Sequence, residues 1–322
     1  MFEFNFDTQP KNTFDTNEVY DFLVIGGGPA GLNASLYAYR LGMKTGIVTY
    51  DIGGQLKNTN DVDNYIGLPN DSGSGLTQKF INHIQQFQIP ILEDVYVTKV
   101  EKLDELFHVY LDNSHIVKAK TVLLATGSVP KKLGIPGEQM LNAKGISYCA
   151  ICDAPFFKDK HVVVAGGGNS AVESALDLAN WAKKVTVIQR SNFRADKILL
   201  EQMYANDKIE YMIQTKIIEI HGKTQVEGLT ILDNKTNQTS YFKADGLFVA
   251  IGMLPNTAYV NDLVELNVYN EVLVNHQQET SVKGLYAAGD MVDQPHKQII
   301  IAAAEGAKAA LHANQYLKYK GE

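Results

Sequence analysis

The chain has 322 residues, of which 45% are hydrophobic and 20% charged, and this length favours two globular domains over one. Its net charge of −7 and isoelectric point near 5.6 argue against a nucleic-acid-binding surface, which needs a clustered positive face. No apolar run approaches the roughly 20 residues of a membrane span, and the polar N-terminal stretch lacks the pattern of a signal peptide. We therefore expect a cytoplasmic protein with neither a nucleic-acid nor a membrane partner.

The first predicted elements are a strand and a helix within residues 20–42. The apolar run Phe22–Ile25 ends in a glycine turn and an amphipathic stretch follows, which is typical of a βαβ unit on a parallel sheet. The turn has the pattern G-x-G-x-x-G at Gly26, Gly28 and Gly31. The first glycine permits a tight turn, the second lets the backbone approach a pyrophosphate, and the third allows the helix to pack closely on the strand. This segment predicts a dinucleotide-binding module.

Asp51 is the first acidic candidate for ligand binding. It follows Gly31 by twenty residues, the spacing at which a carboxylate binds a ribose hydroxyl in dinucleotide-binding modules. A solvated turn residue ahead of the glycines at 53 and 54 is an equally good interpretation.

Both cysteines of the chain, Cys149 and Cys152, lie in the segment GISYCAICDA (145–154). A structural zinc site needs four ligands, and the chain has no further cysteine and only scattered histidines, so we expect no metal. A disulfide across two intervening residues closes a very small loop and would stabilise the fold little. The spacing favours thiol–disulfide exchange, in which one thiolate attacks a partner disulfide and the other resolves the mixed intermediate. Asp153 follows directly and could move a proton in this chemistry, or cap a turn.

A second strand–turn–helix pattern occupies residues 161–190. Its strand leads into Gly166, Gly168 and Ala171, which form the G-x-G-x-x-A variant of the same fingerprint. Because the pattern occurs twice, two dinucleotide-binding modules are the simplest interpretation.

Two arginines follow the second module. Arg190 lies nineteen residues beyond Ala171, where modules that bind NADP place a residue for the 2′-phosphate, and Arg194 comes four residues later. Guanidinium groups suit a phosphate dianion because they offer planar forked donors. The alternative is a surface charge cluster together with Lys183 and Lys184.

The apolar runs near the C-terminus are predicted to belong to the same domain as the first module. Residues 284–290, GLYAAGD, place Asp290 at the carboxyl end of a predicted strand, where ligands bind in such sheets, although an ordinary turn residue is an equal alternative. Neither this run nor the helical stretch at 298–317 has a glycine module of its own. The second module is therefore predicted to be inserted into the first, with boundaries near 130 and 257 in segments that contain proline and glycine.

The predicted fold is α/β, with two Rossmann-like dinucleotide-binding domains. The outer domain comprises residues 1–130 and 258–322, and the inner, cysteine-containing domain comprises residues 131–257. Two nucleotide sites and a dithiol suggest a chain of electron carriers, from a nicotinamide to a flavin, to the disulfide and then to an external acceptor.

With these residues assembled, the chain resembles the low-molecular-weight thioredoxin reductases of the bacterial type over nearly all of residues 20–320. The resemblance rests on the motifs GGGPAG, GGQL, ATG, SYCAICD, GGGNSA, FRA, GLFVAIG, PNT and AAGD taken together. It implies FAD on the outer domain, a nicotinamide nucleotide on the inner domain, a homodimer, and a large rotation between the domains. It also implies that Cys149 attacks the acceptor, that Cys152 lies nearest the flavin, and that Asp153 is the acid–base group.

The glycine patterns and the resemblance together predict which residues contact the cofactors. The predicted set is Gly26, Gly28, Pro29, Ala30, Gly31, Asp51, Gly54, Gln55, Asn64, Ala125, Thr126, Gly127, Gly166, Gly168, Asn169, Ser170, Ala171, Arg190, Arg194, Ile251, Gly252, Gly289, Asp290, Lys297 and Gln298.

The chain departs from the family pattern at two places. The NADPH signature H-R-R-x-x-x-R corresponds to residues 188–194, where Ile188 replaces the histidine and Gln189 replaces one arginine. The loss of one charged hydrogen bond to phosphate costs about 1.5–3 kcal/mol, so NADPH is expected and NADH is possible. The usual R-Q pair that follows the GD motif is Lys297-Gln298, which keeps the charge and loses the guanidinium fork.

The predicted function is a thioredoxin-disulfide reductase that moves electrons from NADPH through FAD and the Cys149–Cys152 disulfide to oxidised thioredoxin. One alternative is a disulfide reductase or dithiol oxidase of the same fold that uses NADH, ferredoxin or oxygen. Another is the flavoprotein component of a peroxide-reducing system, although such proteins typically carry further thioredoxin-like domains with another CxxC. A redox-sensing regulator should show broken glycine loops or a lost cysteine, and all of these are intact.

Overall fold

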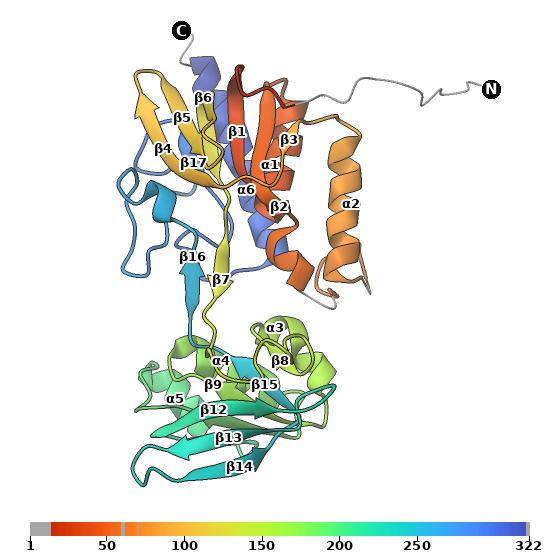
Figure 1. The fold of residues 1–322 in the computed structure, drawn as a ribbon, viewed down its shortest axis with the longest axis vertical. Coiled ribbons are helices and arrows are strands. Elements are labelled where there is room, and N and C mark those ends of the chain that lie inside the picture. The colour runs from red at the N-terminus through yellow and green to blue at the C-terminus, as the bar shows by residue number, and fades with distance from the viewer. Residues whose placement is uncertain (1–13, 59–61, 70, 320–322) are drawn as a thin grey trace, which may run out of the picture. The chain divides into compact units, whose positions relative to one another are not determined.

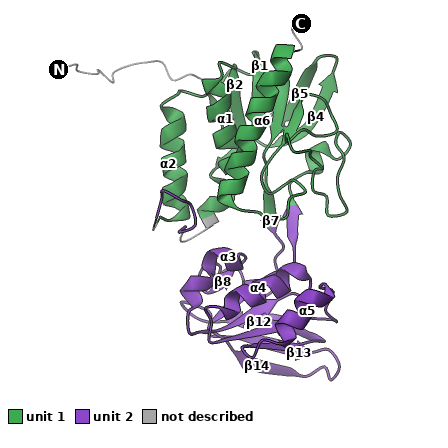
Figure 2. Cartoon of the chain, turned by 180° about the vertical axis from the view of Figure 1, so that it is seen from behind, with its two compact units in different colours: residues 1–58, 71–129, 255–322 green, residues 59–70, 130–254 purple. Residues whose placement is uncertain are grey.

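The chain folds into two compact units in a computed structural model that describes residues 14–58, 62–69 and 71–319. Unit 1 comprises residues 1–58, 71–129 and 255–322, and unit 2 comprises residues 59–70 and 130–254 (Figure 2). The crossing after residue 254 lies three residues before the predicted boundary at 257, and residues 59–70, which the predicted boundaries place in the outer domain, group with unit 2.

Unit 1 is built on one seven-stranded sheet (Figure 1). Its elements are β1 (Val19–Gly27), α1 (Pro29–Arg40), β2 (Thr45–Ile52), the 3₁₀ helix η1 (Gly54–Asn58), α2 (Gly73–Gln85), β3 (Ile91–Leu92), β4 (Val97–Leu103), β5 (Leu106–Leu111), β6 (Ile116–Leu124), the 3₁₀ helix η3 (Ala258–Val260), β17 (Leu285–Ala287) and α6 (Ile299–Tyr319). The strand order is β3-β2-β1-β6-β5-β4, and β17 also pairs with β6. All pairs are parallel except β4 with β5 and β5 with β6.

The central strand β1 explains why its sequence is continuously apolar. A strand in the middle of a parallel sheet is buried on both faces. Leu23 and Ile25 pack into a core cluster with residues of β5 and β6, whereas Phe22 and Val24 pack into a second cluster with residues of α1 and α6. Gly306 allows α6 to pack closely on α1, because a Cβ atom at this position would lie only 2.0 Å from the carbonyl oxygen of Ala30.

Unit 2 has a smaller parallel sheet and a separate antiparallel sheet. Its elements are β8 (Ile146–Ser147), α3 (Ala150–Asp153), the 3₁₀ helix η2 (Ala154–Phe157), β9 (His161–Ala165), α4 (Asn169–Ala179), β10 (Lys184–Ile188), α5 (Lys197–Tyr204), β11 (Ile209–Met212), β12 (Thr215–His221), β13 (Gly228–Asp233), β14 (Thr239–Lys243) and β15 (Gly246–Val249). The parallel strands run in the order β11-β10-β9-β15-β8, and β12, β13 and β14 form the antiparallel sheet.

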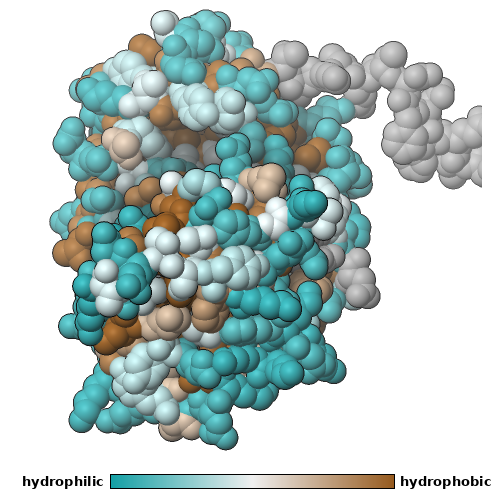
Figure 3. All heavy atoms as spheres, turned by 60° about the horizontal axis from the view of Figure 1, so that its bottom comes forward, coloured by the Kyte–Doolittle hydropathy of each residue, from teal (hydrophilic) through white to brown (hydrophobic). Residues whose placement is uncertain are grey.

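The core of unit 2 also has two parts. One cluster joins the parallel sheet to α4, and the other joins the same sheet to β12 and β13. The outermost strand of the antiparallel sheet, β14, is mostly exposed. Hydrophilic residues predominate along the lower edge of the molecular face in Figure 3, with apolar side chains interspersed, as on an ordinary solvent-exposed surface.

The two segments at the crossings near residues 129 and 255 pair with each other. They are β7 (Ser128–Pro130) and β16 (Met253–Pro255), which form a two-stranded sheet. Both units are Rossmann-like α/β folds, as the sequence predicted, because each places a glycine turn between an inner strand of a parallel sheet and a helix.

Candidate functional site

The first glycine loop in unit 1 has three glycines with different structural roles. Gly26 has a φ of 116°, and a Cβ atom there would lie 2.2 Å from the carbonyl oxygen of Ala125. A Cβ atom on Gly31 would lie 2.0 Å from the carbonyl oxygen of Gly26. A Cβ atom on Gly28 would meet no atom within 4 Å. Packing therefore requires the first and third glycines, whereas the second borders open space that a ligand could occupy.

The N-terminus of α1 adjoins this open space. Gly28 is the N-cap and Pro29 follows it in the first turn, and no side chain accepts a hydrogen bond from the first backbone N–H groups. Such groups need acceptors, and a helix N-terminus favours an anion. The loop and the helix therefore fit the pyrophosphate of a dinucleotide.

Strand register brings three predicted segments to the same edge of the unit 1 sheet. Ile25 of β1 pairs with Leu124 of β6, and Leu124 pairs in turn with Ala287 of β17. The residues that follow these strands are the glycine loop, the turn at 125–127 and the turn that contains Gly289 and Asp290. The carboxyl ends of parallel strands meet here, as a ligand site in such a sheet requires.

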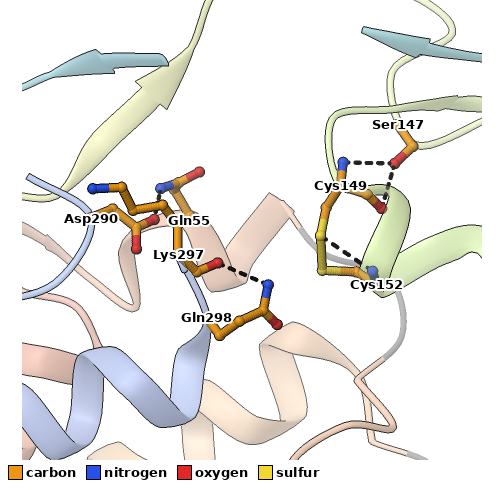
Figure 4. The surroundings of a disulfide bond; sticks show 7 residues. All are labelled: Gln55, Ser147, Cys149, Cys152, Asp290, Lys297 and Gln298. Atoms are coloured by element: carbon orange, nitrogen blue, oxygen red, sulfur yellow. Dashed lines mark hydrogen bonds between the residues drawn. A yellow bond between two sulfur atoms is a disulfide. The ribbon is translucent and has the colours of Figure 1, made fainter. Parts of the chain in front are cut away.

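Asp290 is a partly buried acid at this edge. Gln55 donates from Nε2 to Asp290 Oδ2 at 2.8 Å (Figure 4). Burial raises the pKa of the Asp290 carboxyl, while the charge of Lys297 and the hydrogen bond from Gln55 act in the opposite direction. The site thus combines a carboxylate with an amide that orients it.

The ammonium group of Lys297 has two partners within unit 1. It forms an ion pair with Glu271 at 3.0 Å and donates a hydrogen bond to the carbonyl oxygen of Val292. The next residue, Gln298, donates from Nε2 to the carbonyl oxygen of Lys297 (Figure 4). Lysine at this position therefore stabilises the segment that leads into α6.

Of the two other predicted residues of the outer domain, Asp51 lies at this same edge, beside the glycine loop, because the next residue, Ile52 of β2, pairs with Gly27 of β1. Asp51 forms an ion pair with Lys57 at 3.2 Å, and both side chains are about half exposed (45% and 47%). Asn64 is exposed and belongs to the segment that groups with unit 2.

The second glycine loop, in unit 2, repeats the geometry of the first. Gly166 has a φ of 147°, and a Cβ atom there would lie 2.3 Å from the carbonyl oxygen of Ala250. A Cβ atom on Gly168 would meet no atom within 4 Å. Gly168 is the N-cap of α4 and no side chain caps this helix, so a second anion site is formed in the same way. Ala171 is fully buried in the core of unit 2.

The remaining inner-domain residues of the predicted set surround this loop. Asn169 exchanges two hydrogen bonds with Asp196, at 2.8 and 2.9 Å, and Ser170 is exposed at the start of α4. Ile251 and Gly252 follow β15 and are exposed, and Gly252 has a φ of 106°. Strand pairing of Val249 with Ala165 places these residues beside the loop.

The turn after β10 contains the two predicted arginines. Arg194 donates its backbone N–H to the carbonyl oxygen of Gly167 at 2.7 Å, which holds the turn against the glycine loop. Both arginine side chains are exposed, and within the described part of the chain neither guanidinium has a carboxylate partner. Gln189, in contrast, is 6% exposed and lies under the loop, where a Cβ atom on Gly167 would be 2.4 Å from its Nε2.

Cys149 and Cys152 form a disulfide in unit 2, with their Cα atoms 5.3 Å apart (Figure 4). Cys149 is the N-cap of the short helix α3, and its sulfur accepts a hydrogen bond from the N–H of Cys152 at 3.2 Å. Ser147 Oγ accepts from the N–H of Cys149 at 3.0 Å. Asp153 is the last residue of α3 and is partly buried.

Two buried acids near these sites were not among the predicted residues. Glu305 of α6 is 6% exposed and accepts a hydrogen bond from the N–H of Gly289 at 2.8 Å, and burial raises its pKa. Glu138 of unit 2 is 4% exposed and accepts from the hydroxyl of Tyr148. The one sequence signal for Glu305 is a single acid within the alanine-rich run AAAEGAKAA; Glu138 has none.

Within the described residues, no group of three or more histidine, cysteine, aspartate or glutamate side chains could hold a metal ion. No helix in the same part of the chain is both long enough and apolar enough to cross a membrane.

Two Rossmann-like units with open glycine loops, one of them carrying a CxxC disulfide, define a dinucleotide-dependent redox protein. The chain matches the model of the pyridine nucleotide-disulphide oxidoreductase family over residues 20–306. It belongs to this family, and family membership implies FAD and a pyridine nucleotide as cofactors, which the two glycine loops and uncapped helices fit.

Solved structures and curated proteins support this membership. The chain is 37% identical to a thioredoxin reductase from Streptococcus pyogenes, with a TM-score of 0.89 and coverage of 94% of this chain and 99% of that one. A thioredoxin reductase from Giardia duodenalis is 30% identical, with a TM-score of 0.88 and coverage of 94% and 100%. One component of the alkyl hydroperoxide reductase from Staphylococcus aureus is 40% identical over 311 residues, which are 96% of this chain and 61% of that protein. The chain thus spans about three-fifths of that curated relative.

Proposed function

We propose that the protein is a thioredoxin-disulfide reductase that takes electrons from NADPH and passes them, through FAD and the Cys149–Cys152 pair, to a thioredoxin-like protein in the cytoplasm. The observation that carries the proposal is the Cys149–Cys152 disulfide in a unit that also has a dinucleotide loop. A structural disulfide of this spacing would stabilise the fold little, whereas a redox disulfide needs a source of electrons close by in the same protein.

The proposed sites divide between the two units. FAD would bind to unit 1 at the Gly26–Gly31 loop, the turn at 125–127 and the Gly289–Asp290 turn. The nicotinamide nucleotide would bind to unit 2 at the Gly166–Ala171 loop. When bound, FAD supplies two-electron chemistry between a hydride donor and a disulfide.

The cysteines would carry the electron pair to the acceptor by two exchanges. In the reduced protein, the Cys149 thiolate attacks a sulfur of the acceptor disulfide, which forms a mixed disulfide and releases one acceptor thiolate. The Cys152 thiolate then attacks Cys149 Sγ, which restores the internal disulfide and releases the second acceptor thiolate. Each released thiolate takes up one proton, and Asp153, next to Cys152 in the chain, is the proposed carrier of protons at this site.

The donor is proposed to be NADPH because of Arg190 and Arg194. Their guanidiniums are exposed beside the second glycine loop, and within the described residues no acid neutralises them. Such groups bind the 2′-phosphate that distinguishes NADPH from NADH. Gln189 is turned inward, so it would shape the turn without contacting the phosphate.

The test is anaerobic stopped-flow absorbance of the FAD-loaded protein mixed with NADPH or, separately, with NADH. Rapid loss of the oxidised-flavin band with NADPH, and much slower loss with NADH, supports the proposed donor. Equal or faster reduction by NADH contradicts it. Thioredoxin reduction is then followed with NADPH in excess, and the absence of turnover with reduced flavin contradicts the proposed acceptor.

A peroxide-reducing thiol protein is the second candidate acceptor. The observation that favours it is the 40% identity to the alkyl hydroperoxide reductase component from Staphylococcus aureus. Turnover of a peroxidase partner plus hydroperoxide, compared with turnover of thioredoxin under the same conditions, distinguishes the two acceptors. We also propose a homodimer, which sedimentation of the FAD-loaded protein would test.

A further inference from the structure

Glu138 is the most buried acid of unit 2 that the proposed function does not use. Only 4% of its surface is exposed, and a buried carboxylate is stable only when its oxygens accept hydrogen bonds. Glu138 Oε1 accepts from the N–H of Leu133 at 2.9 Å and from the hydroxyl of Tyr148 at 3.0 Å. Glu138 Oε2 accepts from the N–H of Gly134 at 2.7 Å. Three donors therefore take the place of water around this group.

The donors come from two separate segments. Leu133 and Gly134 lie in residues 131–137, which we call the strap, because the chain re-enters unit 2 through them at residue 130. The strap is also fixed farther along, since the N–H of Ile220 donates to the carbonyl oxygen of Pro136 at 3.0 Å. Tyr148 lies in the other segment, between the end of β8 and Cys149.

At Tyr148 the main chain leaves the parallel sheet, and the main chain of the neighbouring Cys149 has local partners, Ser147 Oγ and the N–H of Asp153. Pairing of β8 with β15 ends at Ser147, and α3 begins at Ala150, so Tyr148 and Cys149 lie between two short elements. The Tyr148 ring packs partly buried against the same core cluster as Leu133 of the strap. Burial, reinforced by the Glu138 carboxylate, raises the pKa of the phenol, which therefore stays protonated and keeps donating at neutral pH.

We propose that Glu138 is a positioning residue for the redox disulfide: it ties the strap to Tyr148 and so fixes the backbone next to Cys149. The inference rests on the proposed role of Cys149 in thiol exchange. A displacement of the strap would therefore alter the position of Cys149 Sγ through the Glu138 carboxylate and the Tyr148 phenol.

Two substitutions separate the parts of this link. Glu138→Gln keeps the size of the side chain but replaces one accepting oxygen with an amide that donates, so the carboxamide cannot satisfy all three donors. Tyr148→Phe removes only the hydroxyl and leaves the strap bonded to Glu138. Tyr241→Phe is the matched control, because the Tyr241 hydroxyl donates to the carbonyl oxygen of Glu227 at 3.0 Å in the same unit.

The experiment measures the rate of alkylation of each cysteine by iodoacetamide in the dithiothreitol-reduced, FAD-loaded protein, with mass spectrometry resolving Cys149 from Cys152. We expect Glu138→Gln and Tyr148→Phe each to accelerate labelling of Cys149 about three- to tenfold, because one charged hydrogen bond no longer restrains its segment. Labelling of Cys152 should change less, and Tyr241→Phe should label as the wild type does. The double variant should match Glu138→Gln alone, because both changes break the same link.

Two results would overturn the proposal. One is a Cys149 alkylation rate in Tyr148→Phe equal to that of the wild type. If Glu138→Gln does not fold, the rate in Tyr148→Phe decides the question alone. The other is equal acceleration at both cysteines with an earlier unfolding transition of unit 2, which the fluorescence of the single tryptophan, Trp181, reports. Labelling involves neither nicotinamide nor acceptor, so a failure of the proposed function would leave this result unaffected.

Discussion

The two glycine loops have the same backbone geometry but opposite electrostatic surroundings. In each, the first glycine has a positive φ and lies against a carbonyl of the neighbouring strand end, and the second borders open space. Unit 1 places the partly buried Asp290 and the buried Glu305 near its loop, whereas unit 2 places two exposed arginines beside its loop. Enclosed polar groups suit a cofactor that stays bound, and exposed cations suit a charged ligand that exchanges with solvent. The difference implies that one scaffold has been adapted to two modes of binding.

The largest expected effect comes from the Cys149–Cys152 disulfide, which lies in unit 2. Cys149→Ser or Cys152→Ser should abolish reduction of the acceptor disulfide, because neither exchange can be completed with one thiol. FAD should remain bound, since its proposed site lies in unit 1. The measurement is thioredoxin turnover together with the flavin absorbance of the purified variants. Substantial turnover by either variant would rule out the dithiol mechanism.

The next effect tests whether the two loops are equivalent. Gly26→Ala would place a methyl group 2.2 Å from the carbonyl oxygen of Ala125, and Gly166→Ala would place one 2.3 Å from the carbonyl oxygen of Ala250. Each substitution also forces a non-glycine residue to a positive φ, at a cost of about 1–3 kcal/mol. We expect Gly26→Ala to purify without FAD, and Gly166→Ala to keep FAD but lose its reduction by nicotinamide nucleotides. Flavin content and stopped-flow reduction measure the two losses.

Gly42→Ala is the control for backbone strain alone. Gly42 has a φ of 81°, but a Cβ atom there would meet nothing within 4 Å. This variant should lose stability and keep both functions. If Gly166→Ala released FAD while Gly26→Ala retained it, the assignment of the cofactors to the units would be reversed.

Much of this architecture follows from short-range patterns in the sequence. The apolar run before Gly26, the glycine spacing and the following helix predict β1, the loop and α1, because each depends on neighbouring residues. The same holds for β9, Gly166 and α4. The disulfide partner of Cys149 follows from there being only one other cysteine.

Contacts between distant segments could not be predicted in this way. Glu305 lies sixteen residues from the N–H of Gly289 that it accepts from, and only the packing of α6 brings them together. The sequence also does not indicate which way the Gln189 side chain points. It lies under Gly167 and donates to the carbonyl oxygen of Asn192 at 3.3 Å. A pattern comparison treats it as a lost phosphate ligand, whereas the structure shows a buried residue that shapes the turn.

The third prediction concerns the cations of unit 2. Arg190→Ala and Arg194→Ala should each lower kcat/KM for NADPH about 10- to 100-fold, because one charged hydrogen bond to phosphate is worth about 1.5–3 kcal/mol. The kcat/KM for NADH should change little, so the quantity to measure is the ratio of kcat/KM for NADPH to kcat/KM for NADH. Lys183→Ala is the matched control for a general loss of positive charge, and it should leave the ratio unchanged. An equal fall for both nucleotides would show that the arginines do not contact the 2′-phosphate.

The smallest expected effect concerns the acids of unit 1 and tests whether they serve binding or folding. Burial raises the pKa of Asp290 in the folded protein above its unfolded value. Between these two values the folded state holds more protons, so stability falls as pH rises through this window and stays lower above it. Asp290→Asn should remove this loss while its Oδ1 still accepts from Gln55. The FAD-free variant should therefore be more stable than the wild type at neutral pH, by about 1 kcal/mol or less, and show no advantage at acidic pH.

Asp21, also in unit 1, is the control of opposite sign. Although burial raises the pKa of Asp21, hydrogen bonds from Lys120 and from the N–H of Lys44 lower it overall. Asp21→Asn should therefore destabilise the FAD-free protein at neutral pH, and the difference should vanish as pH falls through the lowered pKa. Urea unfolding at several pH values, followed by circular dichroism, measures both. If Asp290→Asn stabilises the FAD-free protein and yet weakens FAD retention, the acid is present for binding, and the contrast with the exposed cations of unit 2 is one of function. If Asp290→Asn destabilises at neutral pH as Asp21→Asn does, the acid serves folding and the contrast loses that meaning.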